Sequence, residues 1–142
     1  LEKECGTGLV LVSSHSSARP ICLKDSDMLK SSERFLPISD LVFKNHFGAC
    51  FVAEIKSCRK LPAAKKMCIS KCKTHTGMKF PFSHFRDTKL SRALLQLGFL
   101  CKSFGAKCGA VVLVDSKCNN VKVVKLPKPM QSAVERNTLV VS

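Results

Sequence analysis

The chain has 142 residues, which is enough for one domain with a hydrophobic core, and its 45% hydrophobic content argues against disorder throughout. Its formal net charge is +14, from 24 Lys and Arg against 10 Asp and Glu. This excess predicts a polyanionic partner, either nucleic acid or an anionic membrane surface, with a merely soluble basic protein as the alternative. No apolar run approaches the roughly 20 residues that span a bilayer.

Residues 1–35 are interpreted as an N-terminal extension to a domain over 36–142. Within the extension, the apolar runs at 8–12 and 20–24 predict two short strands around a Ser-rich segment, and a polar loop follows. We expect the extension to pack on the domain edge or on a neighbouring molecule. A loosely ordered tail is the alternative.

The next stretch predicts a helix followed by a strand. Pro37 suits a helix start, and the apolar or turn-forming positions after it recur at helical spacing up to Gly48: Ile38, Leu41, Val42 and Asn45. Residues 49–57 then alternate between apolar and mixed positions, which is typical of a half-buried strand.

Residues 57–78 are interpreted as a basic insertion, because no acid occurs between Glu54 and Asp87. Residues 56–79 carry eight cations without an interspersed acid, which favours a phosphate-contacting loop over a solvated face. The predicted contact residues in this insertion are Arg59, Lys60, Lys65, Lys66, Lys71 and Lys73.

Residues 80–101 contain the clearest amphipathic helix. Its apolar face is formed by Leu90, Ala93, Leu94 and Leu97. Asp87 or Thr88 is the predicted N-cap, and Gly98 is predicted to end the helix.

The C-terminal third predicts a hairpin and a last strand. Residues 110–114 and 121–126 are β-rich and flank a turn-like segment, and residues 137–142 predict the final strand. The expected fold is therefore α+β, with two helices packed on one face of a short, mostly antiparallel sheet. The expected order is helix, strand, helix, hairpin, after the N-terminal extension.

The cysteines allow two interpretations, free thiols in a reducing compartment or a zinc site. Nine cysteines, an odd number, favour a reducing compartment over a secreted disulfide framework. A zinc site is the second reading, because a Cys/His cluster lies inside the basic insertion, formed by Cys58, Cys68, Cys72 and His75. Free or core thiols are the simpler interpretation, and we expect neither a metal nor a cofactor.

Catalysis finds little support in the sequence. Cys50 with His46, and Ser83 with His84, are conceivable nucleophile–base pairs, but neither lies in a catalytic motif. A further Ser/His group lies in low-information sequence: Ser13, Ser14 and His15. The acids are few and dispersed, so paired-carboxylate chemistry is not expected either. The absence of Trp and Tyr argues against recognition by aromatic stacking on single-stranded bases.

Two segments resemble a known family. PISDLVFKNHFGA (37–49) is similar to the opening helix of the small-subunit ribosomal protein eight family. FPFSHFRDTKLSRALLQLGFL (80–100) is similar to its Pro-Ser turn and the helix that ends in Gly-Phe-Ile, with Pro81, Ser83 and Gly98 in the matching places. The insertion at 57–78 and the lack of the C-terminal Ser-Thr-x-x-Gly loop depart from that family.

The resemblance implies a non-catalytic binder of small-subunit ribosomal RNA that also contacts neighbouring ribosomal proteins, without a membrane or a small-molecule substrate. It implies RNA contacts at Lys44, His46, Ser83 and Lys89, with recognition by shape. Extensions, many cysteines and a chain that begins at Leu1 suggest a divergent mitochondrial version. The alternatives are a free-standing, zinc-stabilised nucleic-acid-binding domain and a secreted, disulfide-linked basic protein.

Overall fold

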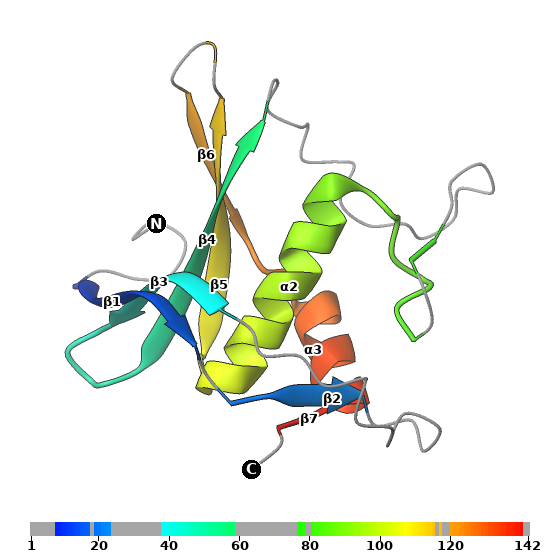
Figure 1. Ribbon diagram of the computed structural model, residues 1–142, viewed down its shortest axis with the longest axis horizontal. Helices are drawn as coiled ribbons and strands as arrows, with labels where there is room; N and C mark the ends of the chain where they lie inside the picture. Colours follow the sequence, from blue (N-terminus) through cyan, green and yellow to red (C-terminus); the bar gives the residue numbers. More distant parts are fainter. Residues whose placement is uncertain are drawn as a thin grey trace.

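The computed structural model places a five-stranded sheet beside two helices (Figure 1). It describes residues 8–17, 19–23, 38–58, 77–78, 81–115, 117 and 120–140. The main sheet has the order β1-β3-β4-β5-β6, and β2 pairs with β7 in a second sheet. In chain order the elements are β1 (Val10–Ser17), β2 (Ile21–Leu23), β3 (Ile38–Lys44), β4 (Cys50–Cys58), α2 (Lys89–Phe104), β5 (Cys108–Asp115), β6 (Val121–Lys125), α3 (Lys128–Asn137) and β7 (Thr138–Val140). The α+β class is confirmed, whereas the predicted order is wrong because strands come first.

The segment predicted as the first helix is strand β3. It pairs antiparallel with β1 on one side and with β4 on the other. Ile38, Leu41 and Val42 fit a helical period, but a short apolar run fits a strand equally well. Backbone partners on both sides of β3 decide between the two, and Phe43 and Val42 are favourable strand residues. Gly48 therefore belongs to a turn between two strands.

Strands β4 and β5 are parallel and are connected through α2. They pair in register from Phe51↔Cys108 to Cys58↔Asp115, while the other neighbouring strands of the main sheet are antiparallel. Helix α2 covers one face of this pair, and its buried face forms the core with Val52, Val111 and Leu113. The helix comes so close that a Cβ on Gly109 would lie 3.0 Å from Leu97 Cδ1. The predicted strand at 49–57 is confirmed, although its first half is buried rather than half-buried.

The predicted central helix is confirmed as α2, with one correction at its end. Thr88 is the N-cap, and its hydroxyl accepts a hydrogen bond from Ser91 N at 3.0 Å. The helix passes through Gly98 and ends at Gly105, which adopts a left-handed conformation with φ +66°. Gly98 instead permits close packing on α3, because a Cβ there would lie 2.9 Å from Val134 Cγ2.

Helix α3 was not expected from the sequence. Pro127 is its N-cap and Pro129 lies in its first turn, where a missing N–H costs nothing. Met130, Ala133 and Val134 form its buried face, and Lys102 Nζ of α2 pairs with Glu135 Oε2 at 2.9 Å. Neither described helix is long and apolar enough to cross a membrane.

The expected terminal strands are present. The 8–12 prediction corresponds to β1, which extends to Ser17 and forms an edge of the main sheet. The 20–24 prediction corresponds to β2, which pairs with β7 through Ile21↔Val140. The predicted hairpin is β5–β6, with Val112 opposite Val123.

Candidate nucleic-acid interface

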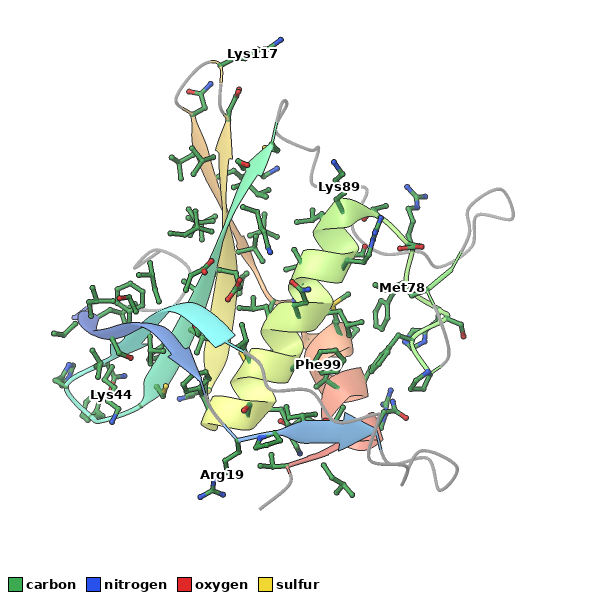
Figure 2. The ribbon with its side chains drawn as sticks, viewed as in Figure 1. Arg19, Lys44, Met78, Lys89, Phe99 and Lys117 are labelled. Atoms are coloured by element: carbon green, nitrogen blue, oxygen red, sulfur yellow. The ribbon has the colours of Figure 1, made fainter. Side chains whose placement is uncertain are left out.

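The predicted RNA-contacting residues that the structure describes lie at two ends of α2. Lys44 borders the same depression as Phe104, the last residue of α2, whereas Lys89 is its first residue (Figure 2). The 16 residues of α2 correspond to about 24 Å at ~1.5 Å per residue. Lys44 with His46 and Ser83 with Lys89 are therefore two separate groups. The other predicted contacts lie outside the described residues: Arg59, Lys60, Lys65, Lys66, Lys71 and Lys73.

The turn before α2 presents Ser83 outward. Phe82 and Phe85 are buried in the core, and Phe85 N donates to Phe82 O at 3.1 Å. Ser83 and His84 between them are exposed. The two buried phenylalanines thus fix the turn and direct the serine to the surface beside the start of α2.

Sequence reasoning missed a pair of lysines that the sheet brings together. Lys56 on β4 and Lys122 on β6 are the register partners of Leu113 on β5. Leu113 is a core residue beneath α2, and directly opposed residues share one face of a sheet. The two lysines therefore flank Leu113 on the α2 face. The alternation of VKVVK (121–125) is the only sequence signal for this placement.

These lysines belong to one basic end of the molecule. Lys117 follows β5 at the tip of the β5–β6 hairpin, at the same end as Lys89 (Figure 2). We call this group the helix-start surface, defined as Lys56, Lys89, Lys117 and Lys122. Parallel strands β4 and β5 end here and α2 begins here, so the end of the sheet and the helix start carry the same sign of charge.

The described acids leave this surface positive. Asp87 Oδ1 pairs with Arg92 Nε at 3.1 Å, and Asp115 is buried and accepts a hydrogen bond from Lys117 N at 2.8 Å. Within the described part of the chain, Lys56, Lys89 and Lys117 form no ion pair. Lys89 and Lys117 are exposed and available for phosphate oxygens, whereas Lys56 is half-buried and its charge also acts on the carboxyl of Glu54.

The candidate catalytic pairs do not form catalytic arrangements. Burial raises the pKa of the Cys50 thiol, with the charge of Lys44 opposing the effect, so the thiol form is favoured over the nucleophilic thiolate. His46 lies on the exposed turn with its ring against Phe47, at 4.0 Å between centroids. His84 is likewise exposed and contacts the Phe85 ring, and no hydrogen bond joins it to Ser83.

Only one of the metal-site candidates lies in the described part of the chain. Cys58 ends β4 and donates a weak hydrogen bond to Val114 O at 3.7 Å. Cys68, Cys72 and His75 lie outside the described residues. The zinc reading therefore stays a prediction.

Comparisons with protein-family models, with curated proteins and with solved structures found no match.

Proposed function

We propose that the chain is a non-catalytic RNA-binding protein whose helix-start surface contacts phosphates. The observation that carries the proposal is the placement of Lys56 and Lys122 on either side of Leu113, at the end of the sheet where Lys89 begins α2. The net charge of +14 supports a polyanionic partner. Ser83 and the basic insertion adjoin the same helix in sequence, and both would extend this contact.

Salt dependence of RNA binding tests the surface. We expect the double variant Lys56→Gln, Lys122→Gln to bind RNA more weakly and to reduce the slope of log K against log salt by about two, since each phosphate contact contributes about one released counterion. A matched control is Arg19→Gln, Arg136→Gln, which removes the same charge from exposed positions near the β2–β7 sheet. Equal losses of RNA affinity and of salt slope in both double variants would mean that only net charge matters, and the surface assignment would fail.

We further propose that the RNA is ribosomal and that the assembly is the small subunit of a mitochondrial ribosome, where neighbouring ribosomal proteins are the other partners. The support is the first part of the motif at 80–100, because a turn with an exposed Ser83 leads into a helix, although this helix continues past Gly98 to Phe104. The 37–49 motif no longer supports the resemblance, since it forms a strand and a turn instead of a helix. No cofactor or small-molecule substrate belongs to this function.

Sedimentation of a lysate separates this assignment from a free-standing nucleic-acid-binding domain. We expect the protein to migrate with small ribosomal subunits, and to leave them when salt is raised. Migration with soluble monomers would favour the free-standing domain, and zinc retained after chelator-free purification would favour its metal-stabilised form. The secreted alternative predicts disulfides, which thiol counting under denaturation would detect, and among the described side chains Cys50, Cys58 and Cys101 form none.

A further inference from the structure

The turn between β3 and β4 is rigid and displays an aromatic pair. Asn45 Oδ1 accepts hydrogen bonds from Phe47 N and Ala49 N, both at 3.0 Å, and Gly48 N donates to Asn45 O at 3.0 Å. Gly48 has φ +82°, which glycine adopts without strain. Because its own hydrogen bonds fix the turn, the residues at its tip are held in place before any ligand arrives.

Phe47 at this tip is 83% exposed, and its ring rests against His46. The Phe47 side chain packs into no core, while Phe82 and Phe85 elsewhere in the chain are buried. An exposed phenylalanine on a rigid turn beside Lys44 has the composition of a base-stacking platform, in which an aromatic face adjoins a cation. The absence of Trp and Tyr does not exclude stacking on an exposed phenylalanine, so stacking on Phe47 is open to test.

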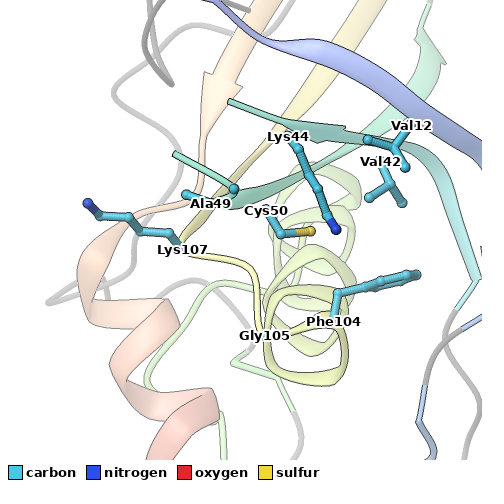
Figure 3. A pocket seen from close by; sticks show the side chains of 9 residues that line it. Val12, Val42, Lys44, Ala49, Cys50, Phe104, Gly105 and Lys107 are labelled. Carbon is cyan, nitrogen blue, oxygen red and sulfur yellow. The ribbon is translucent and has the colours of Figure 1, made fainter. Parts of the chain in front are cut away.

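A depression of about 530 Å³ adjoins this turn, between the ends of β3 and β4 and the last turn of α2. Its size falls within the roughly 300–1,000 Å³ typical of small-ligand sites. Figure 3 shows the side chains of Lys44 and Cys50 directed toward the same space, with Phe104 lying below the end of Lys44 and Lys107 extending outward. None of the described residues that line it is acidic.

The walls of this depression suit a flat, anionic ligand. Phe104 is half-buried and packs on the core, so its ring is supported from behind. The backbone N–H of Lys107 donates a hydrogen bond to Cys50 O at 3.0 Å, which fixes Lys107 beside the start of β4. Cys50 carries a neutral thiol, which leaves Lys44 as the charge that faces the interior.

We propose that this depression binds an unpaired nucleotide of single-stranded RNA, with the base against Phe104, the phosphates at Lys44 and Lys107, and a neighbouring base stacked on Phe47. The inference rests on the proposed RNA-binding function and adds a single-strand site at the end of α2 opposite the helix-start surface. An acidic peptide would satisfy the lysines, but two aromatic faces beside them favour bases, whose faces are planar and aromatic. A base paired in a helix cannot enter, because its faces are already stacked.

The absence of Trp in the chain gives a direct test. Phe47→Trp places a single indole at an exposed position, where it does not affect packing, and Phe104→Trp places one in the depression. The matched control is Phe99→Trp, because Phe99 packs edge-on against Phe82 at 5.8 Å between ring centroids. Each variant is titrated with a heptamer of uridylate, a self-complementary RNA duplex and an acidic peptide.

We expect the uridylate heptamer to quench the indole fluorescence of the Phe47→Trp and Phe104→Trp variants in a saturable manner, and to leave the Phe99→Trp control unchanged. We also expect Phe47→Ala to lower affinity for the heptamer by roughly 5- to 100-fold, as for loss of one stacked base, and to leave duplex affinity unchanged. Quenching by the duplex or by the peptide, in place of the heptamer, would overturn the inference.

The two proposals fail separately. If the protein binds RNA through the helix-start surface but neither indole at this site responds, the single-strand site is wrong and the proposed function stands. If the wild-type chain binds no RNA at all in a filter assay, the proposed function is wrong, and this inference falls with it.

Discussion

Asp40 and Glu54 lie opposite each other on β3 and β4, and each carboxylate accepts a backbone N–H from the other strand. Asp40 N donates to Glu54 Oε1 at 3.2 Å, and Ile55 N donates to Asp40 Oδ2 at 2.9 Å. The backbone pairing of β3 with β4 ends at Leu41↔Ala53. Beyond that point, the carboxylates of Asp40 and Glu54 hold the two strands together through hydrogen bonds from the backbone. Two acids in a basic chain are thus used to hold strands together.

This arrangement makes Glu54 sensitive to pH. Burial raises the pKa of the Glu54 carboxyl above its ordinary value of 4.5. The hydrogen bond from the Asp40 backbone and the charge of Lys56 oppose this rise, and the charge of Asp40 adds to it. The folded state therefore binds this proton more tightly than the unfolded chain does, and the ionised carboxylate costs stability at neutral pH.

We predict that Glu54→Gln raises the free energy of unfolding relative to wild type at neutral pH. The advantage shrinks as pH falls through the folded pKa toward 4.5, where the wild-type side chain becomes neutral in both states. Urea denaturation at several pH values measures this difference. An advantage that grows as pH falls would contradict the assignment.

Asp40 is expected to act mainly as a hydrogen-bond acceptor. Asp40→Ala removes the acceptor for Ile55 N and should lower the free energy of unfolding by about 1 kcal/mol. Asp40→Asn keeps a side-chain oxygen and should cost less. If both substitutions cost the same in urea denaturation, the charge of Asp40, and not the hydrogen bond, stabilises the strands.

Gly98 is expected to tolerate no side chain while Val134 faces it. Although alanine favours helices over glycine, a Cβ at this position would lie 2.9 Å from Val134 Cγ2. We predict that Gly98→Ala lowers the free energy of unfolding by about 1–3 kcal/mol through overpacking.

Val134→Ala in the same chain provides the control. It should relieve the clash, so that the double variant is less destabilised than the sum of the single variants. Thermal or urea unfolding of all four proteins gives the coupling. Strict additivity would show that the two helices move apart freely at this contact.

The thiol of Cys101 is expected to be the slowest of the described thiols to react. Burial, with smaller contributions from nearby Cys108, Cys50 and Glu135, raises its pKa to about 12, and the side chain is buried beneath the sheet. Alkylation followed by peptide mass spectrometry should label Cys58 and Cys50 before Cys101, and all of them in denaturant. Rapid labelling of Cys101 in the folded protein would indicate local opening of α2.

The basic insertion is expected to add to RNA affinity independently of the helix-start surface. Replacing Lys65, Lys66, Lys71 and Lys73 by Ala should weaken RNA association and flatten its salt dependence. Combining these changes with Lys56→Gln and Lys122→Gln should reduce the slope further. An unchanged slope in the first variant would mean that the insertion is only a solvated face.

Local patterns in the sequence determined the elements whose signals were unambiguous. Leu90, Ala93, Leu94 and Leu97 predicted the buried face of α2, and Thr88 was one of two predicted caps. Residues 110–114 and 121–126 predicted the β5–β6 hairpin. The exposure of Lys44 and Lys89 also follows from the sequence, since charged groups stay in water.

Tertiary structure decided the rest, because the deciding partners lie far along the chain. Ile38–Lys44 became a strand because β1 and β4 supply backbone partners on both sides. Gly98 lets Val134 of α3 pack closely against α2, whereas the sequence alone predicted that this glycine ends the helix. Lys56 and Lys122 face the same way only through their common partner Leu113. Lys44 was predicted as an RNA contact, but only the fold sets it opposite Phe104, which is more than fifty residues away in the sequence.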